Sequence, residues 1–356
     1  MSSLPRKKPI MSLKKLRRRV YHETIVKKLS QEFGYSLENC LLVSSHGLAR
    51  LAHGHYRFHP CFDPKLFWFG SHYVFYLRTD DVEKFLPKIS VRPSTHMNNI
   101  LLLVGDSDTP VGGSTRILLE EFAIRNAPMW VYCQNLAEPS KVLNNVPIGL
   151  DYHSNFFSND FFQPDRKLPL HQELALIDLL SMSEVWHSRS LQVSVDWAGS
   201  THRGDRLQAL NSIPKNLSKL TDFGGNKRVN QGEIWKQHLS CQFVASPFGV
   251  GLDCHRTWEA IALGCVPITC RSGLSPLFKN LPVLELDDWS ELTEERLLQA
   301  ADEFSKKTFD FGVMFMSYWR EVFANGVPES SRYQGKLEDW PSIFRAEFDR
   351  NHWDCA

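Results

Sequence analysis

SPFGVGLDCHRTWEAIALGCVPI, residues 246–268, carries the clearest structural pattern in the chain. Its loop contains Gly249 and Gly251, which let backbone amides approach a ligand closely. Apolar side chains at helical spacing follow, then Gly264 as a helix stop and Pro267 at the start of another apolar run. The pattern predicts a glycine loop, a helix and a buried strand. A bound anion would be stabilised where such a helix begins.

Arg256 and Glu259 lie three residues apart, so both project from one side of the predicted helix. Arg can bind phosphate oxygens with two hydrogen bonds, and Glu can accept from vicinal sugar hydroxyls. Such a pair alone is often a solvated salt bridge, but here a glycine loop and a GCVPI run accompany it. Asp253 is the predicted N-cap of the helix. The residues of this segment that are candidates for binding a phosphorylated sugar ligand are Ser246, Gly249, Gly251, Asp253, His255, Arg256 and Glu259.

The same segment resembles the donor-binding region of exostosin-like GT-B glycosyltransferases, glycosyltransferase family 47 and its viral, bacterial and algal relatives. In that family a loop, an Arg and a Glu precede the pattern EA…GC(I/V)P(I/V). The resemblance is close over residues 246–286 and looser over 100–154, about a third of the chain. It implies transfer of a sugar from a nucleotide-diphosphate donor, expected to be a UDP-sugar, to a hydroxyl of a glycan or glycoconjugate. It also implies inversion at the anomeric carbon without a metal.

The length of 356 residues, with 42% hydrophobic and 12% aromatic content, suffices for two domains with separate cores. Strand and helix patterns alternate in both halves, which predicts an α/β protein of the GT-B type, with two doubly wound Rossmann-like domains facing across a cleft. We place an acceptor-side domain at 1–165 and a nucleotide-sugar-binding domain at 166–310. A helical segment at 311–356 is expected to cross back to the first domain.

The net charge of +1 gives no global attraction to nucleic acid or to an anionic membrane. The eight cysteines form no CxxC pair, so reduced thiols are expected. No apolar stretch reaches the roughly 18 residues of a membrane span, and no apolar run follows the basic start as in a signal peptide. We therefore expect a cytoplasmic protein. The basic residues of 6–19 are either a solvated tail, as most such tails are, or a peripheral contact with anionic lipid headgroups. Nucleic acid is not an expected partner.

Three residues in the first half are candidates for the general base that deprotonates an acceptor hydroxyl. The apolar run 100–104 ends in the sequence GDSD, which supplies Asp106 and Asp108, although turn formation or helix capping explains these acids equally well. His153 closes the segment NVPIGLDYH, which looks like the end of the first domain in relatives. The DSD triplet also matches the metal-binding DxD of another glycosyltransferase architecture. The GT-B interpretation nevertheless predicts no metal and no cofactor beyond the nucleotide sugar.

In the second half, Arg203 and Arg206 follow a strand predicted at 193–198, where a diphosphate lies in a doubly wound domain. Both are donor-binding candidates, although an exposed Arg is common on protein surfaces and does not by itself indicate a ligand. Further strands are predicted at 40–43, 129–133, 146–150, 221–225, 241–245 and 282–286. Further helices are predicted at 13–33, 170–182, 231–239 and 311–323.

Glycosyl transfer needs a base for the incoming hydroxyl and positive charge for the departing diphosphate, which Arg256 and the helix N-terminus would supply. Two alternatives remain open. A GT-B-shaped sugar-nucleotide epimerase would use the same donor site and isomerise its substrate without an acceptor. A non-catalytic protein that binds a nucleotide or an anionic surface would bind DNA or anionic lipid in a salt-sensitive way without responding to UDP.

Overall fold

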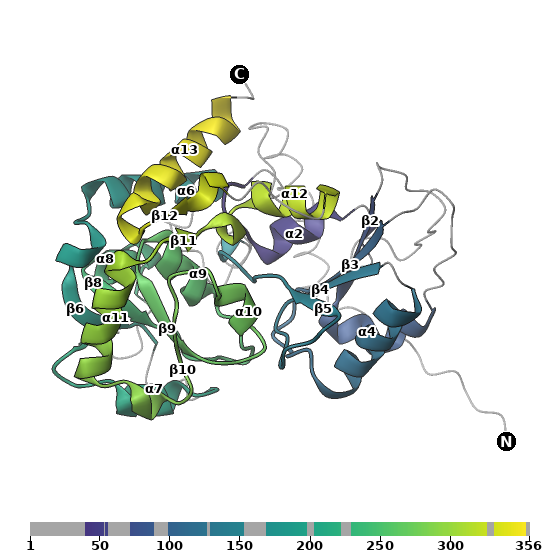
Figure 1. The fold of residues 1–356 in the computed structure, drawn as a ribbon, viewed down its shortest axis with the longest axis horizontal. Helices are drawn as coiled ribbons and strands as arrows, with labels where there is room; N and C mark the ends of the chain where they lie inside the picture. Colours follow the sequence, from purple (N-terminus) through teal and green to yellow (C-terminus); the bar gives the residue numbers. More distant parts are fainter. Residues whose placement is uncertain are drawn as a thin grey trace, which may run out of the picture.

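The computed structural model describes residues 40–52, 54–55, 72–88, 99–126, 129–152, 169–197, 203–221, 229–325 and 331–353. Two five-stranded sheets form the framework, and helices pack around them (Figure 1). Every strand pairing within these two sheets is parallel. The chain is therefore a mixed α/β protein with Rossmann-like parallel sheets, which confirms the predicted fold class at this level.

The first sheet has the order β1-β2-β3-β4-β5, and the second has the order β10-β9-β8-β6-β7. The strands of the first sheet are β1 (Gly54–His55), β2 (His72–Arg78), β3 (Asn99–Gly105), β4 (Met129–Cys133) and β5 (Leu143–Asn145). Those of the second are β6 (Ser190–Val195), β7 (Ser218–Leu220), β8 (Cys241–Ala245), β9 (Val266–Cys270) and β10 (Leu284–Leu286). A short antiparallel pair joins β11 (Phe309–Asp310) to β12 (Gln334–Gly335).

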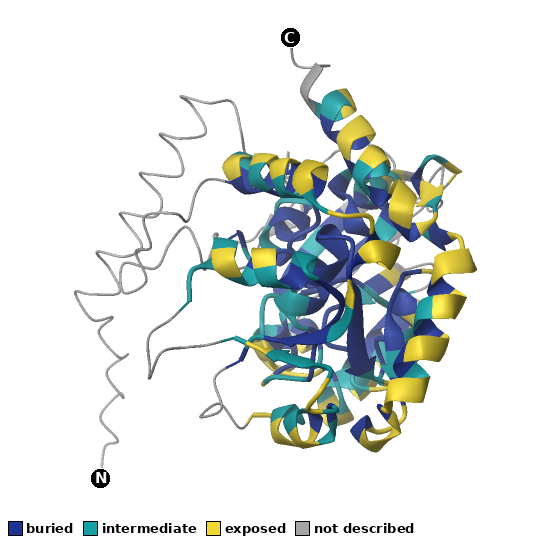
Figure 2. Ribbon diagram, turned by 90° about the vertical axis from the view of Figure 1, so that its left-hand side faces the viewer, coloured by how far each residue is buried: buried dark blue, intermediate teal, exposed yellow. Residues whose placement is uncertain are grey.

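The helices cover both faces of the sheets, and Figure 2 shows their outward faces exposed and the strands between them buried. They are α2 (Ser45–Leu51), α3 (Val82–Phe85), α4 (Gly113–Arg125), α6 (Pro169–Met182), α7 (Arg206–Ser212), α8 (Gln231–Leu239), α9 (His255–Ala262), α10 (Ser275–Phe278), α11 (Glu294–Lys306), α12 (Met316–Asn325) and α13 (Trp340–Trp353). Among the described residues, no helix combines the length and the apolar character needed to cross a membrane.

Local sequence signals account for several of these elements. All five residues of β8 are buried, as a central parallel strand requires, and its bounds match the predicted 241–245. The helix predicted at 231–239 is α8, and β4 has its predicted bounds. Thr293 caps α11, since its side chain accepts a hydrogen bond from the Arg296 N–H.

Two predicted strands are wrong. Residues 40–43 are buried but lie in neither sheet; Leu42 forms only an isolated bridge with Phe315. Their backbone bonds instead reach distant groups, with Val43 N–H donating to the Met314 carbonyl at 2.8 Å. Residues 146–150 likewise lie outside the sheets, and β5 ends before them. A buried connector with satisfied backbone groups has the same apolar sequence as a buried strand.

Other differences concern elements that were predicted with different bounds or were not predicted. The segment predicted as one helix at 311–323 is a 3-10 turn, Gly312–Met314, followed by α12. The final helix α13 and the strand β2 were not predicted. β7 ends at Leu220, directly before the strand predicted at 221–225, and residues 222–225 lie outside the described residues. The helix predicted at 13–33 and the basic residues of 6–19 lie outside the described residues.

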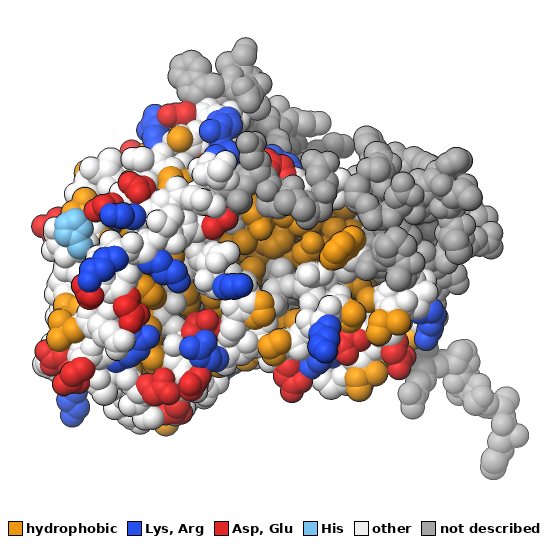
Figure 3. Space-filling model, in the orientation of Figure 1, with side chains coloured by type: hydrophobic (Ala, Val, Ile, Leu, Met, Phe, Trp, Pro, Cys, Tyr) orange, Lys and Arg blue, Asp and Glu red, His pale blue; other side chains and the backbone are white. Residues whose placement is uncertain are grey.

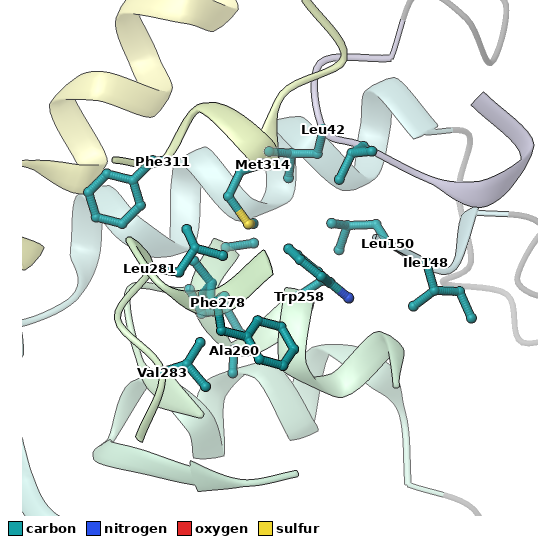
Figure 4. Packing of buried hydrophobic residues seen from close by; sticks show 14 of the residues in the cluster. Leu42, Ile148, Leu150, Trp258, Ala260, Phe278, Leu281, Val283, Phe311 and Met314 are labelled. Atoms are coloured by element: carbon teal, nitrogen blue, oxygen red, sulfur yellow. The ribbon is translucent and has the colours of Figure 1, made fainter. Parts of the chain in front are cut away.

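We call the part of the chain up to residue 152, which forms the first sheet, the first half, and the part from residue 169, which contains the second sheet, the second half. One core cluster joins these two halves. Figure 4 shows Leu42, Ile148 and Leu150 packed with Trp258 from α9, and with Met314 near the start of α12. A second, smaller cluster lies on the other side of the first sheet and includes buried residues of α4. The helix α12 packs against α2 and β2, so the C-terminal segment contacts the first sheet and its helices. The two sheets are thus joined by a shared hydrophobic core.

Candidate functional site

A cavity of about 690 Å³ lies at the carboxyl ends of β6 and β8. The strand order of the second sheet reverses between these two strands, because β7 lies on the far side of β6 from β8. Ligands of doubly wound sheets bind at such a switch point. The volume lies within the ordinary range of small-molecule sites, roughly 300–1,000 Å³.

The cavity brings together most of the residues predicted from the sequence. The predicted residues that line it are Asp108, Arg203, Arg206, Gly249, Gly251, Asp253, His255, Arg256 and Glu259. Asp106 and Ser246 are not among the lining residues. His153 lies outside the described residues. Three further residues line the cavity and were not predicted: Asp151, Asp196 and Gln231.

Arg256 belongs to a buried chain of charged groups. Its Nε donates to Asp196, whose other carboxylate oxygen lies 3.1 Å from His238 Nε2. Burial alone would raise the pKa of Asp196, but Arg256 and His238 overcome this effect and lower it to about 2. The Arg256 guanidinium also lies over the Trp197 ring, 5.6 Å from its centroid. Arg256 is therefore oriented before any ligand binds.

Arg206, the first residue of α7, has a different environment. Burial lowers the pKa of its guanidinium, and the nearby charge of Arg256 lowers it further. Its Nε is buried without a hydrogen-bond partner, and no carboxylate pairs with it among the residues that the structure describes. A half-buried cation without a counterion is costly. An anion in the cavity would relieve that cost.

Glu259 projects into the same cavity from the second turn of α9. Burial raises the pKa of its carboxyl group. Gln231, the first residue of α8, donates from Nε2 to the Glu259 carboxylate at 3.0 Å. This contact fixes the carboxylate and leaves it able to accept from ligand hydroxyls.

The prediction that Asp253 caps α9 is wrong, because the N-cap residue is Cys254 and its side chain makes no capping bond. Both carboxylate oxygens of Asp253 are used elsewhere. One accepts from the Ile148 N–H at 2.6 Å, and the other accepts from Trp258 Nε1 at 2.7 Å. The Asp253 N–H donates to Asn135 Oδ1 at 2.7 Å. Asp253 is buried, which raises its pKa to about 6, and it joins the two halves of the chain.

His255 makes a second link between the halves. Its Nδ1 lies 2.6 Å from the carbonyl oxygen of Gly149. A carbonyl can only accept, so Nδ1 carries a proton and donates it to this hydrogen bond. His255 lines the cavity with this orientation.

The two acids of the GDSD sequence have different surroundings. Asp106 adopts a left-handed backbone (φ 54°), and its N–H donates to Gln134 Oε1 at 2.8 Å. Its carboxylate lies 3.0 Å from His46 Nε2 and 3.6 Å from Arg78 Nε. Asp108 is exposed and lines the cavity. Of the two, Asp108 is the one that can meet a ligand in this cavity.

The glycine loop lines the cavity and also contacts the first half of the chain. A Cβ atom on Gly251 would lie 2.9 Å from both Asn135 Oδ1 and the Asp108 carbonyl oxygen. Gly251 is therefore needed for close approach of the first half, a role that the sequence did not indicate. Ser246, at the start of the loop, is buried, and its hydroxyl forms a hydrogen bond with Thr257 Oγ1 at 2.7 Å. This bond connects the loop to α9.

Within the described part of the chain, no group of three or more His, Cys, Asp or Glu side chains is arranged to hold a metal ion. The polar groups of the cavity instead combine three arginines, a histidine and several carboxylates. Such a set suits an anionic ligand that also carries hydroxyl groups. No known family model matches the chain, and no curated protein is similar to it at a significant level.

Proposed function

We propose that the chain is a GT-B glycosyltransferase that moves a sugar from a nucleoside-diphosphate donor, expected to be UDP-linked, to a hydroxyl of a glycan or glycoconjugate. The observation that carries the proposal is Arg206, a half-buried guanidinium without an anionic partner among the described residues. A second guanidinium, that of Arg256, shares its cavity. Two cations at the switch point of a doubly wound sheet suit a diphosphate.

In the proposed complex, the diphosphate lies against Arg206, Arg256 and the amides of the glycine loop. Asp196 bonds Arg256 through Nε and so presents the rest of that guanidinium to the ligand. The first turn of α9 adds the partial positive charge of its N–H groups. Glu259, held by Gln231, accepts hydrogen bonds from the ribose hydroxyls.

The acceptor approaches from the first half of the chain, where Asp108 contributes a carboxylate to the cavity wall. Asp108 takes the proton of the attacking hydroxyl as its oxygen forms a bond to the anomeric carbon. The bond between that carbon and the diphosphate oxygen breaks, and the electron pair leaves with the diphosphate. Arg206 and Arg256 stabilise the charge that develops on this leaving group. Attack opposite the leaving group inverts the anomeric carbon.

Ligand-dependent thermal unfolding tests this proposal. We expect UDP and at least one UDP-sugar to raise the melting temperature of the native chain. Arg206→Gln should abolish the response with little loss of stability, because no carboxylate among the described residues forms an ion pair with Arg206. Arg125→Gln is the matched control, since Arg125 is exposed in the last turn of α4. The proposal is wrong if no nucleoside diphosphate stabilises the chain, or if Arg206→Gln responds as the control does.

The products separate the enzyme classes. Incubation with the stabilising UDP-sugar and a panel of glycans should yield UDP and an extended glycan. Isomerised UDP-sugar in the absence of glycan would indicate an epimerase. UDP binding without turnover on any glycan tested would favour a non-catalytic binding protein.

A further inference from the structure

A second cavity, of about 400 Å³, lies beside the edge strand β5, where the first half meets α10 and α12. Figure 3 shows hydrophobic side chains gathered in a hollow between the two halves of the molecule. No residue lines both this cavity and the one at the switch point. It is therefore a separate site.

The two cavities differ in charge. Three arginines, a histidine and five carboxylates line the cavity at the switch point, whereas no Lys, Arg or His is among the residues that line the second one. The single ionisable carboxylate there belongs to Asp310. A phosphorylated or otherwise anionic ligand has no counterion in this cavity. Anionic ligands are therefore disfavoured in this cavity, and one oxygen of the Asp310 carboxylate already accepts from the Gly312 N–H.

Aromatic side chains form one wall. Tyr132 and Tyr318 are partly exposed and contact the buried Trp319, with ring centroids 6.2 Å and 5.4 Å from its centroid. Trp319 Nε1 donates to the Val313 carbonyl at 3.0 Å, which fixes the indole. The wall is rigid, amphipathic and suited to the apolar face of a small polar ligand.

Amide groups line the cavity beside the aromatic side chains, since Asn144 is the strand partner of Tyr132. Asn145 Nδ2 donates to the Gly273 carbonyl at 2.9 Å, which fixes the orientation of the amide, because a carbonyl can only accept. Asn145 Oδ1 is buried without a hydrogen-bond partner among the described residues. Asn144 and the exposed Asn280 add two further amides to the lining. The cavity thus offers acceptors to a ligand that carries several hydroxyl donors.

We propose that this cavity binds a neutral saccharide, with its C–H face against Tyr132 and Tyr318 and its hydroxyls on the Asn145 and Asn280 amides. The volume suits one or two sugar units. Binding here does not depend on the donor chemistry proposed for the other cavity. Saccharide binding here would hold a glycan against the protein without transfer.

Ligand-observed NMR and calorimetry with four neutral trisaccharides, maltotriose, cellotriose, xylotriose and chitotriose, test the proposal, with glucose 6-phosphate as the charged comparator. We expect at least one trisaccharide to bind the full-length protein and glucose 6-phosphate not to bind here. Asn280→Trp fills the cavity from an exposed position and should abolish binding. Tyr318→Ala should weaken it about tenfold or more, and Tyr318→Phe should retain most of it.

Two variants separate this inference from the proposed function. Arg206→Gln should leave trisaccharide binding unchanged while it abolishes the response to UDP. Asn280→Trp should abolish trisaccharide binding while it leaves the response to UDP unchanged. The inference is overturned if none of the four trisaccharides binds. It is also overturned if binding survives Asn280→Trp or is displaced by UDP, because the saccharide would then occupy the other cavity.

Discussion

Arg206 and Arg256 share one cavity but differ in how their charges are compensated. Arg256 is paired with the buried Asp196, so its removal would leave that carboxylate with His238 as its remaining partner and would destabilise the fold. Arg206 has no such partner among the described residues. A loss of function in Arg256 variants therefore mixes folding with binding, whereas Arg206 variants report on the ligand alone.

Asp108→Asn should lower the turnover of glycosyl transfer about 100-fold or more while the affinity for UDP stays unchanged, because a general base acts on the acceptor hydroxyl. Asp106→Asn is the matched control two residues away, since Asp106 faces His46 and Arg78 and does not line the cavity. Steady-state kinetics with donor and acceptor varied separately measure both effects. Loss of turnover in Asp106→Asn with normal Asp108→Asn would instead assign the base to the His46–Asp106 pair.

The buried Asp253 predicts a specific pH dependence of stability. Its pKa is about 6 in the folded state, against an ordinary value of 3.8. Because the folded state holds this proton more tightly, the contribution to stability is fully present below about pH 3.8 and is lost as pH rises through about 6. The difference amounts to about 3 kcal/mol.

Urea unfolding at intervals between about pH 4 and pH 7 measures this contribution. The free energy of unfolding of Asp253→Asn should fall less with rising pH than that of the native chain. Asp178→Asn, on the exposed side of α6, is the control and should follow the native curve. Parallel curves for all three proteins would show that Asp253 is ionised throughout.

At the scale of elements, the segment from β8 through α9 to β9 could be predicted because its signals are contiguous. Gly264 adopts a left-handed backbone (φ 66°) just after α9, as a helix stop requires. The 40–43 run was mistaken for a strand because its backbone bonds reach residues such as Glu173 and Met314, which local periodicity does not encode. α13 could have been found, since Trp340, Phe344 and Phe348 recur every fourth residue and are buried.

The same distinction holds for the site. Arg256 and Glu259 were predicted because one short motif contains both residues. Asp196 and Gln231 reach the cavity from other elements, and only the strand order places them there. Asp196 did have a signal, because this acid lies near the end of a predicted strand, and it directly follows β6 as Asp106 follows β3.

The turn at Gly273 tests the contact between elements of the two halves. A Cβ atom there would lie 2.0 Å from the Leu136 carbonyl oxygen and 2.6 Å from the Glu138 nitrogen, both backbone atoms. Gly273→Ala should therefore lower the free energy of unfolding by at least about 2 kcal/mol. In Gly232→Ala the new Cβ meets only Asn230 Oδ1, at 3.4 Å, and stability should stay within about 1 kcal/mol of native. Equal stabilities in denaturant titrations would contradict this account.

At the scale of the whole molecule, the two halves share hydrogen bonds and a hydrophobic core. Hydrogen bonds cross between them at Asp253, His255 and Gly273, and one core cluster contains residues of both. The sequence predicted a separate core for each domain. It could not indicate that one side of the first sheet, through Leu101 and Leu103, shares the core of the second.

We therefore expect calorimetry to give a single unfolding transition, with a calorimetric enthalpy equal to the van't Hoff enthalpy. UDP at about 100 times its dissociation constant should stabilise this transition by about 2.7 kcal/mol, because the ligand binds only the folded state. Arg206→Gln should keep the single transition and lose the shift. Two transitions, with UDP moving only the one that contains α9, would mean that the second sheet folds and binds the nucleotide independently of the first.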